Sequence, residues 1–156
     1  MTQMLPTTDR EMFLAIAWGF LGTFYTWGGD DPSGFDCSGL VVECAKSVGL
    51  LPRSGDYTAA GLWTRWKHLH VPNPAPGDVV FFGKGGRVTH VEICALGAPA
   101  LSIGASGGGS KTKTREDAIR DNAFIKVRPI WGRGVSHEVV GIVDLFTERP
   151  PLGGGV

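Results

Sequence analysis

Residues 22–41, GTFYTWGGDDPSGFDCSGLV, hold the pattern that decides the fold. The part before the cysteine is rich in Gly, Asp and Pro, which is typical of a structured loop. From Cys37 to about Val48 the apolar residues recur at helical spacing, so the sequence predicts a helix that begins at the cysteine. A thiol at a helix N-terminus faces the positive end of the helix dipole, which favours the nucleophilic thiolate. Cys37 is therefore a candidate nucleophile.

The neighbours of this cysteine have predicted roles at the helix start. We expect Asp36 to cap the helix or to hold Ser38, which is a structural role rather than a catalytic one. Gly39 and the other first-turn amides can donate hydrogen bonds to an oxyanion that forms beside the thiol. Cys44 falls on the apolar face of the same predicted helix, so we interpret it as a core residue.

The remaining segments predict helices first and strands afterwards. Thr8 to Glu11 resembles a capping box in which Thr8 is the N-cap and Glu11 reaches back to it, at the start of a helix over about 9–22. A further helix is predicted over 58–67. The helical periodicity then stops, and five strands are predicted, at 78–82, 89–96, 100–105, 124–130 and 139–145. Residues 106–122 are predicted to form a flexible polar loop with one helical turn at most. The order indicates an α+β fold with helices packed on an antiparallel sheet.

A cysteine nucleophile needs a base, and one histidine lies in a suitable pattern. In the predicted strand 89–96, Val91 and Ile93 alternate with His90, Glu92 and Cys94. One face of this strand is therefore apolar, and the other carries an imidazole, a carboxylate and a thiol. The other histidines, His68, His70 and His137, lie in segments predicted to be solvent-facing connectors. His90 is the candidate base.

Composition excludes several classes of function. The chain has 156 residues, enough for one domain, and its 15 basic and 15 acidic residues cancel, whereas a nucleic-acid binder usually has a basic excess. It has no apolar run long enough to span a membrane. Its three cysteines form no CxxC pair and are too few for a disulfide framework. The acidic residues at 30–36 do not alternate as calcium ligands do. We therefore expect neither a metal nor a cofactor.

Two strings resemble the signatures of the NlpC-type cysteine peptidases, the papain-like peptidoglycan hydrolases. The first is Tyr25 with WGG (27–29) and DCSG (36–39), and the second is PGDVVFF (76–82) followed by THVEI (89–93). The resemblance covers roughly residues 9–146. It implies a papain-like fold in which Cys37 is the nucleophile and His90 is the general base. It also implies that Tyr25 helps to form the oxyanion site.

The chain departs from this family at the group that orients the histidine. The family usually places a polar residue, often His, on the next strand, and by register that position is Gly104, which has no side chain. Three interpretations follow. A backbone carbonyl or a water orients His90; or Ser102 or Ser106, on the same strand face, substitutes; or Glu92, on the face of His90, contributes. An orienting group fixes the tautomer and stabilises the imidazolium.

The resemblance also implies a substrate and a reaction. The expected activity is hydrolysis of an amide in the peptidoglycan stem peptide, with the γ-D-glutamyl-diaminopimelate bond favoured. The alternatives are an N-acetylmuramoyl-L-alanine amidase, an acyltransferase or transglutaminase that uses the same thiol, and an inactive wall-binding module.

The ends of the chain carry the predictions on location. The N-terminus has no Lys/Arg run before its first apolar stretch, so no secretory signal peptide is predicted. We expect one domain over 1–150, acting as a monomer, and a flexible tail over 151–156. A protein made in the cytoplasm needs another route to the cell wall. Phage lysis machinery or carriage on a phage tail would supply that route.

Overall fold

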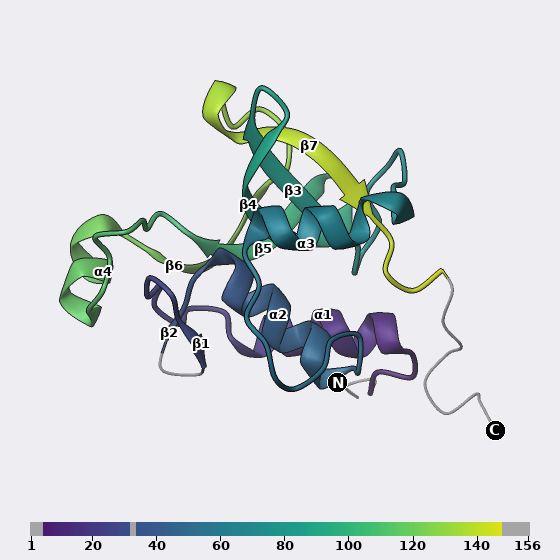
Figure 1. Ribbon diagram of the computed structural model, residues 1–156, viewed down its shortest axis with the longest axis horizontal. Helices are drawn as coiled ribbons and strands as arrows, with labels where there is room; N and C mark the ends of the chain where they lie inside the picture. Colours follow the sequence, from purple (N-terminus) through teal and green to yellow (C-terminus); the bar gives the residue numbers. More distant parts are fainter. Residues whose placement is uncertain (1–4, 32–33, 148–156) are drawn as a thin grey trace.

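The computed structural model describes residues 5–31 and 34–147, in which helices pack against a five-stranded antiparallel sheet (Figure 1). The helices are α1 (Asp9–Gly19), α2 (Cys37–Ser47), α3 (Ala59–Trp66) and α4 (Arg115–Asp121), with 3-10 turns η1 (Lys67–Leu69) and η2 (Val135–His137). The sheet contains β3 (Val79–Lys84), β4 (Arg87–Gly97), β5 (Ala100–Ser106), β6 (Phe124–Pro129) and β7 (Glu138–Val143). Two short strands, β1 (Asp30–Asp31) and β2 (Gly34–Phe35), pair separately. The α+β class and the five predicted strands are confirmed.

Each α-helix begins after a side chain that accepts a backbone N–H of the first turn, which meets the demand of helix N-termini for acceptors. The pairs are Thr8 with Glu11, Asp36 with Gly39, Thr58 with Gly61 and Thr114 with Asp117. The predicted capping box at α1 is only half correct. The Glu11 carboxylate reaches past Thr8 and accepts the backbone N–H of Thr7 at 2.8 Å, and the Thr7 hydroxyl donates to the same oxygen at 3.2 Å.

Helix α1 ends at Gly19, earlier than the predicted residue 22. Gly22 has a φ of +88°, outside the helical region, and its N–H donates to the carbonyl oxygen of Ile125 on β6 at 2.9 Å. The chain therefore leaves the helix in order to pair with the sheet edge. This contact leads residues 23–25 alongside β6, where Tyr25 donates its N–H to Ala123.

Strand β4 lies at the centre of the sheet, whose order is β6-β5-β4-β3-β7. The hairpins β3-β4 and β4-β5 and the connection from β5 to β6 place sequential strands side by side, and β7 returns to the free edge of β3. In this register His90 stands opposite Phe82, and Glu92 stands opposite Val80. The two polar side chains are thus held by a strand with neighbours on both sides.

The hydrophobic core has two parts, one on each face of the sheet. Val79 and Phe81 belong to the larger part, which includes buried residues of α1, α2 and α3. Val80 and Phe82 alternate with them and belong to a smaller cluster with Ile142, which contains no helix residue. Because successive side chains of a strand point to opposite faces, this division explains why β3 is apolar without interruption from Val79 to Phe82: both of its faces are buried.

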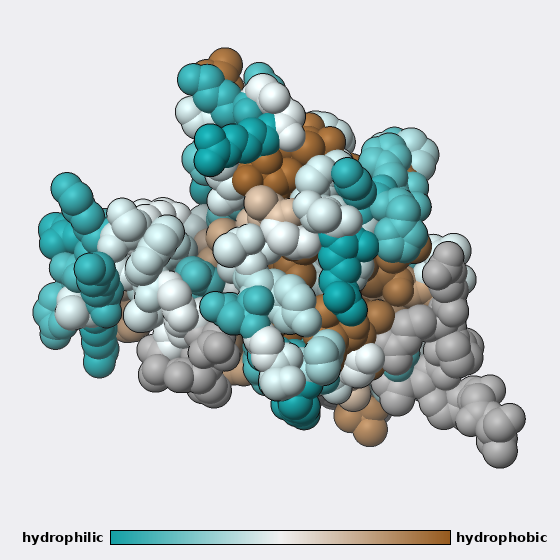
Figure 2. All heavy atoms as spheres, in the orientation of Figure 1, coloured by the Kyte–Doolittle hydropathy of each residue, from teal (hydrophilic) through white to brown (hydrophobic). Residues whose placement is uncertain are grey.

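Residues 106–122 differ from the predicted flexible loop, because they contain the capped helix α4. In the space-filling view, hydrophilic residues gather over the α4 end of the molecule (Figure 2), and within α4 only Ala118 is buried. A short helix with so narrow an apolar face gives little periodicity to detect.

No helix in residues 5–31 and 34–147 is long and apolar enough to cross a membrane. The predicted tail 151–156 lies outside the described residues.

Candidate active site

The start of α2 is fixed by the carboxylate of Asp36. One oxygen accepts the N–H of Gly39 at 2.7 Å and the hydroxyl of Ser38 at 3.3 Å, and the other accepts the N–H of Gly28 at 3.1 Å. A Cβ on Gly39 would collide with the carbonyl oxygen of Gly29, so the helix and the preceding loop approach closely only because residue 39 is glycine. Asp36 and Ser38 therefore have the structural contacts that the sequence analysis expected, and they hold Cys37 at the first position of the helix.

Cys37 and His90 line one cavity of about 590 Å³, together with residues of α3, β5 and β6. Cys37 is half-buried, and the His90 ring, which is 9% exposed, forms a hydrogen bond with its thiol. Burial alone would lower the pKa of His90, but the hydrogen bonds to Cys37 and Glu92 outweigh it and raise the pKa to about 9. The imidazole is thus mostly protonated at neutral pH, which favours an ion pair with a thiolate.

Tyr25 lines the same cavity and is buried. Burial, assisted by the nearby Cys37 and Asp36, raises the pKa of its phenol well above the usual range. The hydroxyl therefore stays protonated and can donate a hydrogen bond to an oxyanion. Tyr25 lies where the resemblance placed it.

Glu92 is the group that contacts the far side of the His90 ring. Its Oε2 lies 2.6 Å from His90 Nε2, and its side chain is fully buried. Ser102 donates its hydroxyl to Glu92 Oε1 at 2.6 Å, so it supports the carboxylate instead of contacting the histidine. Ser106 lines the cavity, and its hydroxyl oxygen is buried without a hydrogen-bond partner among the described residues. Of the proposed orienting groups, the geometry favours Glu92.

Arg133 completes this cluster, and the sequence analysis missed it. Its guanidinium donates to both oxygens of Glu92, at 2.9 Å each, and to the hydroxyl of Ser102 at 2.9 Å. It is 3% exposed and lies over the Phe82 ring, 4.3 Å from the centroid. Burial would raise the pKa of Glu92, but the bonds from His90 and Arg133 outweigh it and hold the pKa well below its usual range. Glu92 therefore remains ionised although its side chain is fully buried.

No sequence pattern marks Arg133, because it lies in a glycine-flanked loop far along the chain from Glu92. His137 was assigned to solvent for the same reason. It lies in η2, lines the cavity and has its ring centroid 5.8 Å from that of His90. His68 and His70 do not line the cavity, as expected.

Gly104 lies beside Glu92, on the neighbouring strand. A Cβ at residue 104 would clash with Glu92 Cγ and lie 2.8 Å from its Cδ. The carboxylate of β4 therefore occupies the space that a side chain on β5 would otherwise fill. There is room for only one of these two side chains, so the absence of a polar group at residue 104 and the presence of Glu92 go together.

Replacing Gly104 with alanine is expected to lower the free energy of unfolding by about 1–3 kcal/mol, because the added methyl must displace a fully paired buried carboxylate. It should also reduce the activity, since Glu92 contacts His90. Urea denaturation measures the first effect. Gly19→Ala is the control, because a Cβ there meets nothing within 4 Å. Equal stability of the two variants would contradict this account of residue 104.

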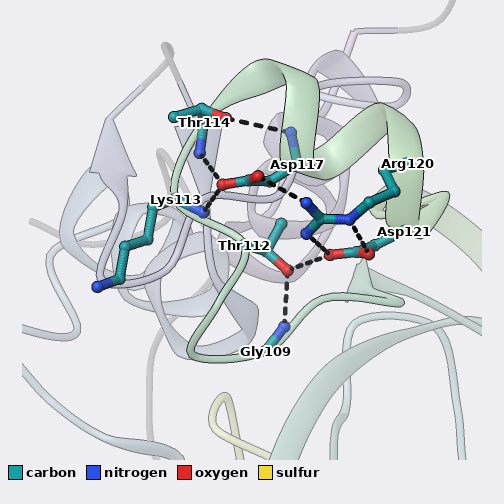
Figure 3. Close-up of polar contacts among 7 residues, drawn as sticks. All are labelled: Gly109, Thr112, Lys113, Thr114, Asp117, Arg120 and Asp121. Atoms are coloured by element: carbon teal, nitrogen blue, oxygen red, sulfur yellow. Dashed lines mark hydrogen bonds and ion pairs between the residues drawn. The ribbon is translucent and has the colours of Figure 1, made fainter.

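Thr112 links the residues before α4 to Asp121 at the end of that helix (Figure 3). Its hydroxyl accepts the N–H of Gly109 at 3.1 Å and bonds Asp121 at 2.9 Å, and its carbonyl accepts the N–H of Trp27 at 2.7 Å. Lys111, Lys113 and Arg115 do not line the cavity. The segment is thus an ordered support for the Trp27 loop rather than a flexible basic loop.

Comparisons with known proteins point to one family. The family model described as "NlpC/P60 family" matches residues 22–128. A probable endopeptidase p60 of Listeria innocua is 38% identical over 81 residues, which is 51% of this chain and 16% of that protein. A gamma-D-glutamyl-L-lysine dipeptidyl-peptidase of Bacillus subtilis is 33% identical over 115 residues, 70% of this chain and 37% of that protein. The chain thus spans well under half the length of either relative.

A solved structure with the same fold is an NlpC/P60 family protein from Bacillus cereus, with a TM-score of 0.67 and 23% identity. The match covers 90% of this chain and 41% of the Bacillus cereus chain. At this level of identity the likeness concerns the fold, and it extends beyond residues 22–128 to nearly all of the chain.

Proposed function

The chain belongs to the NlpC/P60 family, and we propose that it hydrolyses an amide bond of the peptidoglycan stem peptide, with γ-D-glutamyl-diaminopimelate as the favoured bond. The observation that carries the proposal is the buried cluster of Arg133, Glu92 and His90 that ends on the thiol of Cys37. A binding module has no need of an ionised histidine aimed at a thiol, whereas thiol hydrolysis requires one.

The first half of the reaction forms an acyl-enzyme. The Cys37 thiolate attacks the carbonyl carbon, and the charge that moves to the carbonyl oxygen is met by first-turn amides of α2 and by the Tyr25 hydroxyl. His90 then gives its proton to the amine nitrogen as the carbon–nitrogen bond breaks. The products of this half are a thioester on Cys37 and a free amine.

The second half restores the enzyme. Neutral His90 takes a proton from water, the hydroxide attacks the thioester, and the carbon–sulfur bond breaks to release a carboxylic acid. Glu92 holds the ring in one orientation through both halves and stabilises the imidazolium. Arg133 keeps Glu92 charged and fixed, so it acts through Glu92 and not on the substrate.

The choice of bond follows the relatives. One of them carries gamma-D-glutamyl-L-lysine in its name, which supports a bond on the γ-carboxyl side of D-glutamate. An N-acetylmuramoyl-L-alanine amidase would use the same cluster on a neighbouring bond of the same polymer. A transferase would use it with an amine in place of water.

Digestion of purified sacculi, with the fragments identified by mass, tests the proposal. We expect new diaminopimelate amino groups and new D-glutamate γ-carboxyl groups. Lactyl carboxyl groups with free alanine amines would indicate the amidase instead, and an amine adduct formed in added glycine ester would indicate a transferase. If no amide bond is broken in any wall type, the protein is not a hydrolase.

The pH dependence should follow His90. Protonated His90 donates to the leaving amine, so activity is expected to be present below pH 9 and to fall as pH rises through the His90 pKa of about 9. Glu92→Gln removes a charge that raises this pKa. The alkaline limit should therefore move to lower pH, with a loss of about 10²–10⁴-fold at neutral pH. Rate profiles of kcat/KM against pH measure both effects, and an unmoved alkaline limit would exclude Glu92 as the partner of His90.

A further inference from the structure

Arg128 lies in the cavity wall, and no anionic partner for it is found in the part of the chain that the structure describes. It lies on β6, is half-buried and lines the cavity with Cys37, His90 and His137. Among residues 5–31 and 34–147, no carboxylate forms an ion pair with its guanidinium. An unpaired guanidinium in a substrate cavity is free to bind a carboxylate of the ligand, which its planar fork of N–H groups matches.

The carboxylates near the cavity are already used. Asp36 accepts from the start of α2, and Glu92 accepts from His90, Ser102 and Arg133. The charge of Arg128 also acts on its neighbours. Burial lowers the pKa of Lys126 and Arg128 lowers it further, and the pKa of His137 is lowered by burial, then by the charge of His90 and then by that of Arg128. The β6 side of the cavity is therefore locally positive in a chain whose formal net charge is zero.

The position of Arg128 in the sheet assigns it to one side of the scissile bond. Arg128 stands opposite Ser102 in the β5-β6 register, and the Ser102 hydroxyl contacts Glu92, the partner of His90. Arg128 thus lies on the His90 side of the cavity. His90 protonates the leaving amine in the proposed reaction, so this side receives the residue that supplies the amine.

The opposite end of β5 provides a second open polar group. The Ser106 hydroxyl oxygen has no partner among the described residues, lines the same cavity and belongs to a residue that is only 4% exposed. Buried polar atoms are nearly always paired in native proteins, so an unpaired one in a cavity wall indicates a partner that arrives with the substrate. Ser106 and Arg128 mark the two ends of one substrate-binding wall along β5 and β6.

We propose that Arg128 binds a substrate carboxylate on the amine side of the scissile bond and thereby selects the residue that supplies the amine. The proposal rests on the proposed function. Diaminopimelate carries a second carboxylate beside the ammonium group at the end of its side chain, whereas lysine carries the ammonium group alone. Arg128 thus favours diaminopimelate with a free side-chain carboxylate over its amide and over lysine.

The test compares three peptides that share L-alanyl-γ-D-glutamate and differ in the next residue: diaminopimelate, diaminopimelate with an amidated side-chain carboxylate, and lysine. The wild type should cleave the first with a kcat/KM about ten-fold or more above the other two, mainly through KM. Arg128→Gln should lose about ten- to fifty-fold on the free carboxylate and change little on the other two. Arg87→Gln is the matched control, because Arg87 is exposed and does not line the cavity.

The outcomes separate the two proposals. If the wild type cleaves none of the three peptides and no other stem-peptide bond, the proposed function is wrong. The proposed role of Arg128 is then wrong with it. If the wild type cleaves all three equally, or if Arg128→Gln keeps the preference, the subsite alone is wrong. Retained cleavage of the lysine peptide by Arg128→Gln shows that the variant is folded. Calorimetry of the intact peptides in a Cys37→Ala background should give the same order of affinities without turnover.

Discussion

Cys37→Ala is expected to reduce peptidoglycan hydrolysis by at least about 10⁴-fold, because removal of the nucleophile abolishes the acyl-enzyme route. The fold should remain, since the side chain is only half-buried and the Asp36 cap of α2 does not involve it. Stem-peptide binding should also remain. Fragment release measured by mass, together with sedimentation of the protein with sacculi, checks both expectations.

Cys44→Ala is the matched control for this variant. Cys44 is fully buried in the core, and burial raises the pKa of its thiol well above the usual range, so it is neither accessible nor ionised. That variant should lose some stability and keep its activity. A thiol-alkylating reagent should likewise inactivate the wild type with a stoichiometry of one. Hydrolysis that survives in Cys37→Ala would refute the thiol mechanism.

Arg133→Met is expected to destabilise the protein by about 3–5 kcal/mol, because it removes one of the two cationic partners of Glu92 and leaves the buried carboxylate with His90 alone. The methionine chain keeps apolar packing over Phe82, so the loss comes from the charge and from the hydrogen bonds that the guanidinium donates to Glu92, Ser102 and the Pro129 carbonyl. Activity should fall as well, since a carboxylate that becomes protonated no longer stabilises the His90 imidazolium. Chemical denaturation and kcat/KM measure the two effects.

The double variant Glu92→Gln/Arg133→Met distinguishes a charge effect from a loss of packing. Removing both charges should restore much of the stability, because breaking a buried pair costs more than replacing it with neutral groups. It should not restore activity, since His90 still lacks a carboxylate. If the double variant is as unstable as the sum of the two single ones, the Arg133–Glu92 interaction is not the cause.

The elements that hold the site could be predicted because their signals are local. Thr58 and Asp36 each precede an apolar helical run, and β4 alternates through residues 90–94. The caps and the periodicity therefore place Cys37 on a helix and His90 on a strand. That these two residues meet came from the resemblance, because neither spacing nor composition relates residues so far apart.

The parts that could not be predicted depend on contacts between distant segments. Glu92 was one of several candidates until the register showed that Gly104 leaves room for it and that Ser102 supports it. Arg133 has no local signature. Helix α4 did carry a signal, the capping pair of Thr114 and Asp117, but its polar surface masked the period. Strands β1 and β2 have two residues each, too few for alternation to be visible.

The steric exclusion between residue 92 and residue 104 has a consequence for how this site can change over evolutionary time. Two strands each offer a place for the group behind the histidine, but only one place can be filled. A lineage that moves this group from β4 to β5 must gain a side chain at 104 and lose the glutamate at 92. A side chain gained first at 104 would clash with Glu92, and the loss of Glu92 first would leave His90 without its carboxylate partner. Each single substitution therefore gives a poorer enzyme than either complete arrangement. Loss of Glu92 would also leave the buried Arg133 guanidinium without its carboxylate partner, which makes that first substitution more costly in this chain.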